Sequence, residues 1–263
     1  MHSRGRRTTP PSRQGVEGEH ESPPRDINMS TLAARNDSII EPSAGAEPPP
    51  KPRLRGRFHQ AAFFAAIPAG VTLIALAHTA TARAAAVVYA GSLAGLFGVS
   101  SAYHRLQWSP RFRAAMKRAD HSMIYVMIAG TVTPLSLLAL RAPWSFVLLG
   151  SVWAGAAVGI TLKMIRVDGF NVLTGVLYIA LGWSALLFAP QLARHVSAVD
   201  MALVVVGGLL YTSGAIVFLR KRPDPRPATF GYHEVWHSFV VFGSLCHYIA
   251  VLLLVLPTRT GLG

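Results

Sequence analysis

HEVWHSFVVFGSLCHYIAVLLLVL, residues 233–256, is an apolar run in which Glu234 is the only acidic or basic residue besides histidine. A helix needs about 20 predominantly apolar residues to cross a bilayer, so this stretch predicts a membrane span. His233 and His237 open it four residues apart, a spacing that puts both imidazoles on one helix face and is a familiar way to hold zinc. Two ligands do not complete a metal site. The same spacing also fits a pair without a metal, in which one histidine packs in the core and the other faces water.

The same apolar signal recurs along the chain from Phe58 onward. Because seven runs approach the length of a bilayer-spanning helix, we predict an all-α, polytopic membrane protein, a seven-transmembrane helix bundle. The runs lie at about 60–78, 84–104, 120–140, 144–163, 171–190, 199–219 and 233–256.

Composition agrees with this class and excludes others. Of the 263 residues, 51% are hydrophobic and only 14% are charged, in long apolar blocks. The net charge of +13 does not indicate nucleic-acid binding, because Lys and Arg fall between the blocks, where they set topology. With Cys246 as the only cysteine, any metal must be held by histidine and carboxylate.

Residues 1–52 have a different character from the rest. They are rich in Pro, Ser, Arg, Glu and Gly, with few aromatic residues, and cannot bury enough apolar surface to fold. We predict a disordered N-terminal tail over 1–52 and a seven-transmembrane domain over 53–263. So long a polar segment is not a secretory signal peptide, and Met29 is an alternative start to Met1.

Basic residues between the spans indicate the orientation. Fifteen Lys and Arg lie in residues 51–57 and in the connections at 105–118, 163–166 and 220–226, whereas the opposite side has only Arg83, Arg141, Arg194 and Arg259. Positive charge is retained on the cytoplasmic side, so we predict a cytoplasmic N-terminus in the cell's inner or plasma membrane and an external C-terminus.

This topology brings ionisable residues from three spans to one membrane level. His104 closes the second span with Ser100 one turn deeper, Asp120 opens the third span, and His233 and His237 open the seventh. Ionisable groups at membrane depth are costly and therefore functional candidates. Three imidazoles with a nearby carboxylate are typical of a catalytic zinc site, although histidines that only cap helix ends near headgroups would show the same pattern.

These residues together resemble the signature of the hemolysin III family, within the larger group that includes the adiponectin and progestin receptors. More distantly the chain is similar to the alkaline ceramidases. The resemblance covers about residues 53–263 and implies a seven-helix bundle with Zn²⁺ near the cytoplasmic face. It implies that His104, His233 and His237 are the ligands, that Asp120 acts on the metal through a water molecule, and that Ser100 lies beside Asp120.

The function remains open between several classes. Zinc at headgroup depth suits a hydrolase acting on lipid amides, with membrane lipids as the partners. The family name suggests a pore or hemolytic activity, and a receptor-like or structural role for zinc uses the same ligands. His233-Glu234-x-x-His237 also spells the helix motif of zinc proteases, in which the glutamate is the general base.

Glycines and prolines within the spans suggest details of packing. Gly91, Gly95 and Gly98 in the second span predict close contact with neighbouring helices. Pro134 and Pro190 are positions at which a helix can kink or end.

Two further histidines are weaker candidates for metal ligation. His121 is about 100° around the helix from Asp120, which points it away from the metal. His247 is about 15 Å deeper than His237, which favours a buried hydrogen bond over ligation of the same ion.

Overall fold

The structure is a computed structural model that describes residues 51–256. Of the tail predicted to be disordered, residues 1–50 lie outside the described residues. The predicted external C-terminus, residues 257–263, lies outside them as well. Lys51 and Pro52 are described and directly precede a turn at residues 53–56.

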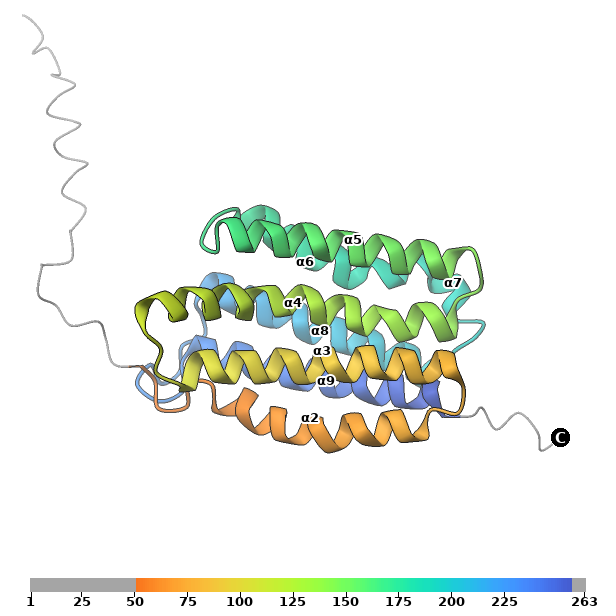
Figure 1. Ribbon diagram of the computed structural model, residues 1–263, viewed down its shortest axis with the longest axis horizontal. Helices are drawn as coiled ribbons and strands as arrows, with labels where there is room; N and C mark the ends of the chain where they lie inside the picture. The colour runs from red at the N-terminus through yellow and green to blue at the C-terminus, as the bar shows by residue number, and fades with distance from the viewer. Residues whose placement is uncertain (1–50, 257–263) are drawn as a thin grey trace, which may run out of the picture. The chain divides into compact units, whose positions relative to one another are not determined.

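Within residues 51–256, seven helical segments are long and apolar enough to cross a membrane, which confirms the predicted fold class. Successive segments run in opposite directions (Figure 1). Their bounds are α2 (Arg57–Leu76), α3 (Ala80–Arg105), α4 (Pro110–Ala139), α5 (Trp144–Ile165), a fifth segment (Val172–Leu192), α8 (Ala198–Arg220) and α9 (Tyr232–Val255).

Alternation places four connecting segments at one end of the bundle, on the left in Figure 1. We call this the basic end; it is formed by residues 51–56, 106–109, 166–170 and 221–231 together with the adjoining helix turns. The predicted clusters of Lys and Arg all lie there, so the loop-by-loop alternation seen in the sequence corresponds to one face of the bundle.

Helix ends follow local capping chemistry. Thr79 begins α3 by accepting a hydrogen bond from the backbone N–H of Ala82 at 3.0 Å. Ser197 and Asp200 form a reciprocal capping box at the start of α8. α9 begins with the Glu234 carboxylate accepting a bond from the Gly231 N–H at 2.9 Å. Each cap satisfies backbone donors that the helix leaves free.

Two segments differ from the predicted runs. α4 begins at Pro110, ten residues before the predicted span, because proline suits the first helical turn and the basic residues after it continue the helix beyond the apolar core. The fifth segment is not one helix: α6 (Asn171–Trp183) passes into a 3₁₀ stretch, η1 (Ser184–Phe188), and then α7 (Ala189–Leu192). α4 continues through Pro134, whereas Pro190 lies in the first turn of α7.

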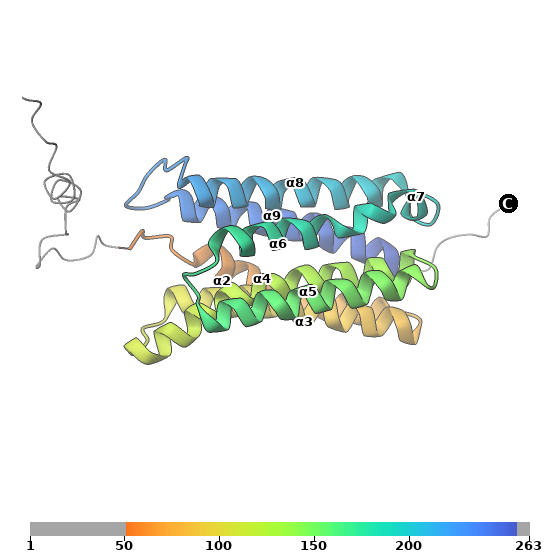
Figure 2. The same ribbon diagram turned by 90° about the horizontal axis from the view of Figure 1, so that it is seen from above.

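Packing places α4 at the centre of the bundle. α8 packs along α9, and α5 packs along α4 (Figure 2). In the apolar window of α4, 67% of residues are buried, compared with 11% in α8. Groups on α4 are therefore carried into the interior, and this helix holds Asp120.

The outer surface is apolar, as lipid contact requires. Phe64, Phe146 and Leu219 expose 66%, 66% and 81% of their surface. In water such a surface would be an aggregation liability, whereas hydrocarbon accepts it. The protein is an integral multi-pass membrane protein.

The glycine prediction is confirmed in part. A Cβ added to Gly95 would lie 2.6 Å from the Met123 side chain, and one added to Gly98 would lie 2.9 Å from Phe63, so both glycines permit close helix contact. Gly91 has nothing within 4 Å, and the prediction of a close contact there is wrong. Sequence gives the small residue but not the direction that it faces.

Candidate metal centre

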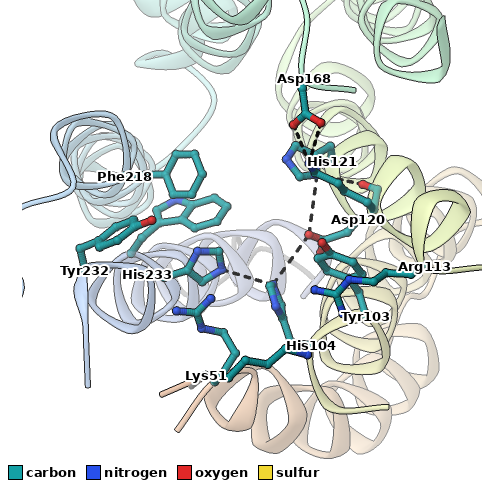
Figure 3. Close-up of a pocket in the computed structure, with 13 residues that line it drawn as sticks. Lys51, Tyr103, His104, Arg113, Asp120, His121, Asp168, Phe218, Tyr232 and His233 are labelled. Atoms are coloured by element: carbon teal, nitrogen blue, oxygen red, sulfur yellow. Dashed lines mark hydrogen bonds and ion pairs between the residues drawn. The ribbon is translucent and has the colours of Figure 1, made fainter. Parts of the chain in front are cut away.

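The five residues singled out from the sequence come from three helices and lie near the basic end. Figure 3 shows three of them, His104, Asp120 and His233. The last turns of α3 carry Ser100 and His104, α4 carries Asp120, and the first turns of α9 carry His233 and His237. Helix termini at one level of an antiparallel bundle bring these residues together although they are distant in the sequence.

The three histidines have the spacing of a ligand set. One ring nitrogen from each of His104, His233 and His237 lies within 4.8 Å of the other two. The Nε2 atoms of His104 and His233 are 3.2 Å apart. Two nitrogens that are both about 2.0–2.1 Å from a tetrahedral zinc ion are about 3.3 Å apart, so this pair fits zinc.

The third imidazole supports the same reading. His237 is 1% exposed, and its Nδ1 has no hydrogen-bond partner among the described residues. Its ring centroid lies 4.5 Å from that of His233 and 5.3 Å from that of His104. A buried imidazole with an unsatisfied nitrogen beside two others has the chemistry of a metal ligand.

Asp120 and Ser100 lie at the edge of the histidine cluster. The Asp120 Oδ2 atom is 3.9 Å from the His104 Nε2 atom, and Asp120 is 9% exposed. Ser100, which is 2% exposed, is close enough to interact with the Asp120 carboxylate. The carboxylate can thus be oriented by the serine and act on a group held between it and the histidines.

His59 is a neighbour of the cluster that the sequence reasoning did not identify. It lies on α2, is 2% exposed, and stacks on His237 with ring centroids 3.8 Å apart and an interplanar angle of 11°. Neither ring nitrogen of His59 has a hydrogen-bond partner among the described residues. His59 and His104 both lie near the basic ends of their spans, so membrane depth alone indicates His59 as a further candidate.

Glu234 is also occupied in a way that sequence could not reveal. Its side chain is fully buried, its Oε1 accepts a hydrogen bond from Arg55 Nε, and its Oε2 caps α9 through Gly231. One carboxylate oxygen is therefore bound to the start of α9 and the other to Arg55 in the segment before α2. This arrangement is unfavourable for the general base that the zinc-protease motif requires.

The two remaining histidine candidates are not among the three whose nitrogens converge, although His121 lines the same cavity and its Nδ1 is 3.9 Å from Asp120 Oδ2. His121 Nδ1 is 2.8 Å from the Lys117 carbonyl oxygen, an interaction within α4. His247 Nε2 is 3.1 Å from the Val204 carbonyl oxygen on α8, which confirms the buried hydrogen bond expected for it.

A cavity of about 260 Å³ opens beside the cluster. Its walls include His104, His233 and Asp120 (Figure 3). Lys51 and Asp168, from two connecting segments of the basic end, also line it. Aromatic side chains of Phe218, Tyr232 and Trp236 line it as well. Such a cavity suits a ligand with an apolar body and a polar group directed at the histidines.

An ion pair closes part of the rim of this cavity. Lys117 Nζ lies 2.5 and 2.7 Å from the two carboxylate oxygens of Asp168. The hydrogen bond from Lys117 holds the pKa of Asp168 below its ordinary value. The pair links α4 to the connection between α5 and α6.

Comparison with known proteins gives a consistent result. A family profile described as "Haemolysin-III related" matches residues 49–248. "Hemolysin-3" of Bacillus cereus is 36% identical over 197 residues, covering 74% of this chain and 87% of that protein. The "Hemolysin-3 homolog" of Bacillus subtilis (strain 168) is 37% identical over 133 residues, 51% of this chain and 60% of the relative. "Monocyte to macrophage differentiation factor" of Homo sapiens is 24% identical over 168 residues, 62% of this chain and 67% of that protein.

Proposed function

Because this chain belongs to the haemolysin III-related family, we propose that it binds zinc through His104, His233 and His237 and hydrolyses a lipid amide. The observation that carries the proposal is the meeting of three imidazole nitrogens within 4.8 Å beside a buried carboxylate and an open cavity. Capping of helix ends alone does not require three rings to converge on one point.

The residues divide into binding and proton-handling roles. When bound, zinc supplies Lewis acidity and brings the pKa of water toward neutrality. Asp120 is placed to orient the attacking water and to accept its proton, then to return a proton to the leaving amine. Ser100 holds the Asp120 carboxylate in position, and the aromatic wall of the cavity provides apolar contact for the lipid.

The position of the centre suggests the substrate class. Helix termini at the basic end lie at the depth where lipid headgroups join their acyl chains, so an amide at that level reaches the cavity without leaving the membrane. We propose that the basic end faces the cytoplasm, since Lys and Arg are retained on that side. A reporter fused after Gly263 should report an external C-terminus, and a cytoplasmic signal would overturn this orientation.

The metal is tested directly by substitution. The purified wild-type protein should retain about one zinc ion per chain, and His104→Ala or His237→Ala should lose it. His78→Ala is the matched control, because His78 is an exposed histidine in the connection between α2 and α3. Zinc content unchanged in His237→Ala would refute the proposed ligand set.

Catalysis is tested by following lipids. A zinc-loaded preparation incubated with a broad lipid extract should release fatty acids from amides, and Asp120→Asn should slow this release by about 10²- to 10⁴-fold without removing zinc. A protease is favoured instead if Glu234→Gln abolishes activity and Asp120→Asn preserves it. If zinc-loaded protein cleaves no lipid amide, zinc has a structural role and holds α3 and α9 together. Chelation would then weaken the packing of these helices without changing lipid turnover.

A hemolytic activity is the second candidate, favoured by the printed names of the Bacillus relatives. Purified protein in liposomes tests it through leakage of a trapped dye. Leakage that persists in His237→Ala would indicate a pore that is independent of the metal, whereas intact liposomes would exclude it.

A further inference from the structure

The lining of the cavity carries more positive than negative charge. Four cations line it, Lys51, Arg55, Arg113 and Lys117, against the two carboxylates of Asp120 and Asp168. Glu234, just outside the lining, neutralises Arg55, and Asp168 neutralises Lys117. Within residues 51–256, Lys51 and Arg113 have no carboxylate within ion-pair distance.

Both cations are held in place by neighbouring structure. The segment after Lys51 is bound to the loop before α9, through the N–H of Arg53 to the Ala228 carbonyl oxygen and the N–H of Leu54 to the Thr229 carbonyl oxygen, each 3.1 Å. The guanidinium of Arg113 lies over the Tyr103 ring, 5.5 Å from its centroid. Tyr103 precedes His104, so this stacking fixes a cation beside the histidine cluster.

The positive charges also lie close to one another. Partial burial, followed by the charges of Arg113 and Arg55, lowers the pKa of Lys51 below its ordinary value. Retention of positive residues on one membrane side explains why cations occur at this end. It does not explain why Lys51, Arg55 and Arg113 line one cavity at the cost of mutual repulsion. A bound anion would offset that repulsion.

We propose that Lys51 and Arg113 form a subsite for the phosphate group of an anionic ligand whose apolar part lies along the aromatic wall of the cavity. The planar guanidinium of Arg113 matches two phosphate oxygens, and the Lys51 ammonium adds a point charge. The aromatic side chains of Phe218 and Trp236 favour an amphipathic ligand over a purely ionic one. That this ligand is the substrate, a phosphate-bearing lipid amide, rests on the proposed function; the binding of phosphate does not.

The test compares two double variants of equal charge. Lys51→Gln with Arg113→Gln removes the subsite, and Lys221→Gln with Arg111→Gln removes one lysine and one arginine from exposed positions at the same end that do not line the cavity. Native mass spectrometry of detergent-solubilised protein measures the affinity ratio of phosphatidic acid to phosphatidylcholine. Each cation should contribute about fivefold, so the subsite variant should lose roughly 25-fold of the preference and the control variant little.

Further arms separate the possible sources of the phosphate and the possible failures. If inorganic phosphate competes as effectively as phosphatidic acid, the site binds free phosphate. If only phosphatidic acid competes, the site binds a lipid headgroup. Both outcomes support the subsite. The preference should survive in His237→Ala and after chelation, so a missing hydrolase activity leaves this result standing. Equal losses in the two double variants, or an unchanged preference in the subsite variant, overturn the proposal. If the double variant misfolds, Lys51→Gln alone, outside the helices, should lose about fivefold.

Discussion

Replacing Gly56 by alanine should disturb the histidine centre through His104. Gly56 precedes α2 with φ of +76°, in the left-handed region that favours glycine. A Cβ added there would lie 2.7 Å from the Cβ of His104, whereas ordinary contacts begin at 3.4 Å. The loop or the histidine must therefore retreat by about 0.7 Å, and zinc sites tolerate about 0.2 Å.

The expected magnitude has two parts. The left-handed backbone costs alanine roughly 1–2 kcal/mol of stability. Displacement of His104 should weaken zinc binding by about 10- to 100-fold, as for other changes that misorient a ligand. Competition with a chromogenic zinc chelator measures the affinity, and thermal unfolding in detergent measures the stability.

Two variants isolate the cause. Gly91→Ala makes the same substitution within α3 where nothing lies within 4 Å, so zinc affinity should not change. Gly56→Asn retains the Cβ but tolerates the left-handed backbone better, so it should lose zinc affinity with a smaller loss of stability. Zinc affinity within about twofold of wild type in Gly56→Ala would refute the contact argument.

The other predictions concern charges and the metal. Glu234→Gln should lower the free energy of unfolding by about 1.5–3 kcal/mol, because the buried carboxylate accepts a charged hydrogen bond from Arg55; chemical denaturation measures this, and an unchanged value would contradict it. Asp168→Asn should cost less than about 1 kcal/mol, since Asp168 is 76% exposed on its side chain. Because Lys117 lowers the pKa of Asp168, that contribution should be present above the ordinary aspartate pKa of about 3.9 and disappear as the pH falls through the lowered value; unfolding across this range should show no such slope in the variant. Chelation should lower the melting temperature reversibly, and zinc at about 1,000 times its Kd should restore about 4 kcal/mol.

The membrane spans were predictable because the signal is local. Transfer of a helix into hydrocarbon depends on its own side chains, so seven apolar runs gave seven spans within a few residues at most ends. The exception, the start of α4, shows the limit of the same signal. Hydropathy detects where a helix leaves the apolar core, whereas backbone hydrogen bonding continues α4 through its basic turns to Pro110.

The candidate site was predictable by depth but not by direction. Alternation of spans assigned His104, Asp120, His233 and His237 to one membrane level without any knowledge of packing. It could not tell which way each helix faces around its own axis, and so it missed the stacking of His59 on His237. For the same reason the contact predicted for Gly91 was wrong.

The sequence by itself determined the class of protein and the apolar spans, since both follow from composition along one helix. Alternation of the spans assigned His104, Asp120, His233 and His237 to one end of the bundle. Only the tertiary structure decided that the imidazoles of His104, His233 and His237 converge, because convergence depends on the rotation of α3 against α9. Only the tertiary structure shows that Glu234 binds Arg55. The glutamate of the His233-Glu234-x-x-His237 motif therefore caps its own helix instead of facing a substrate. Contacts between distant segments carry that information, and no local pattern contains it.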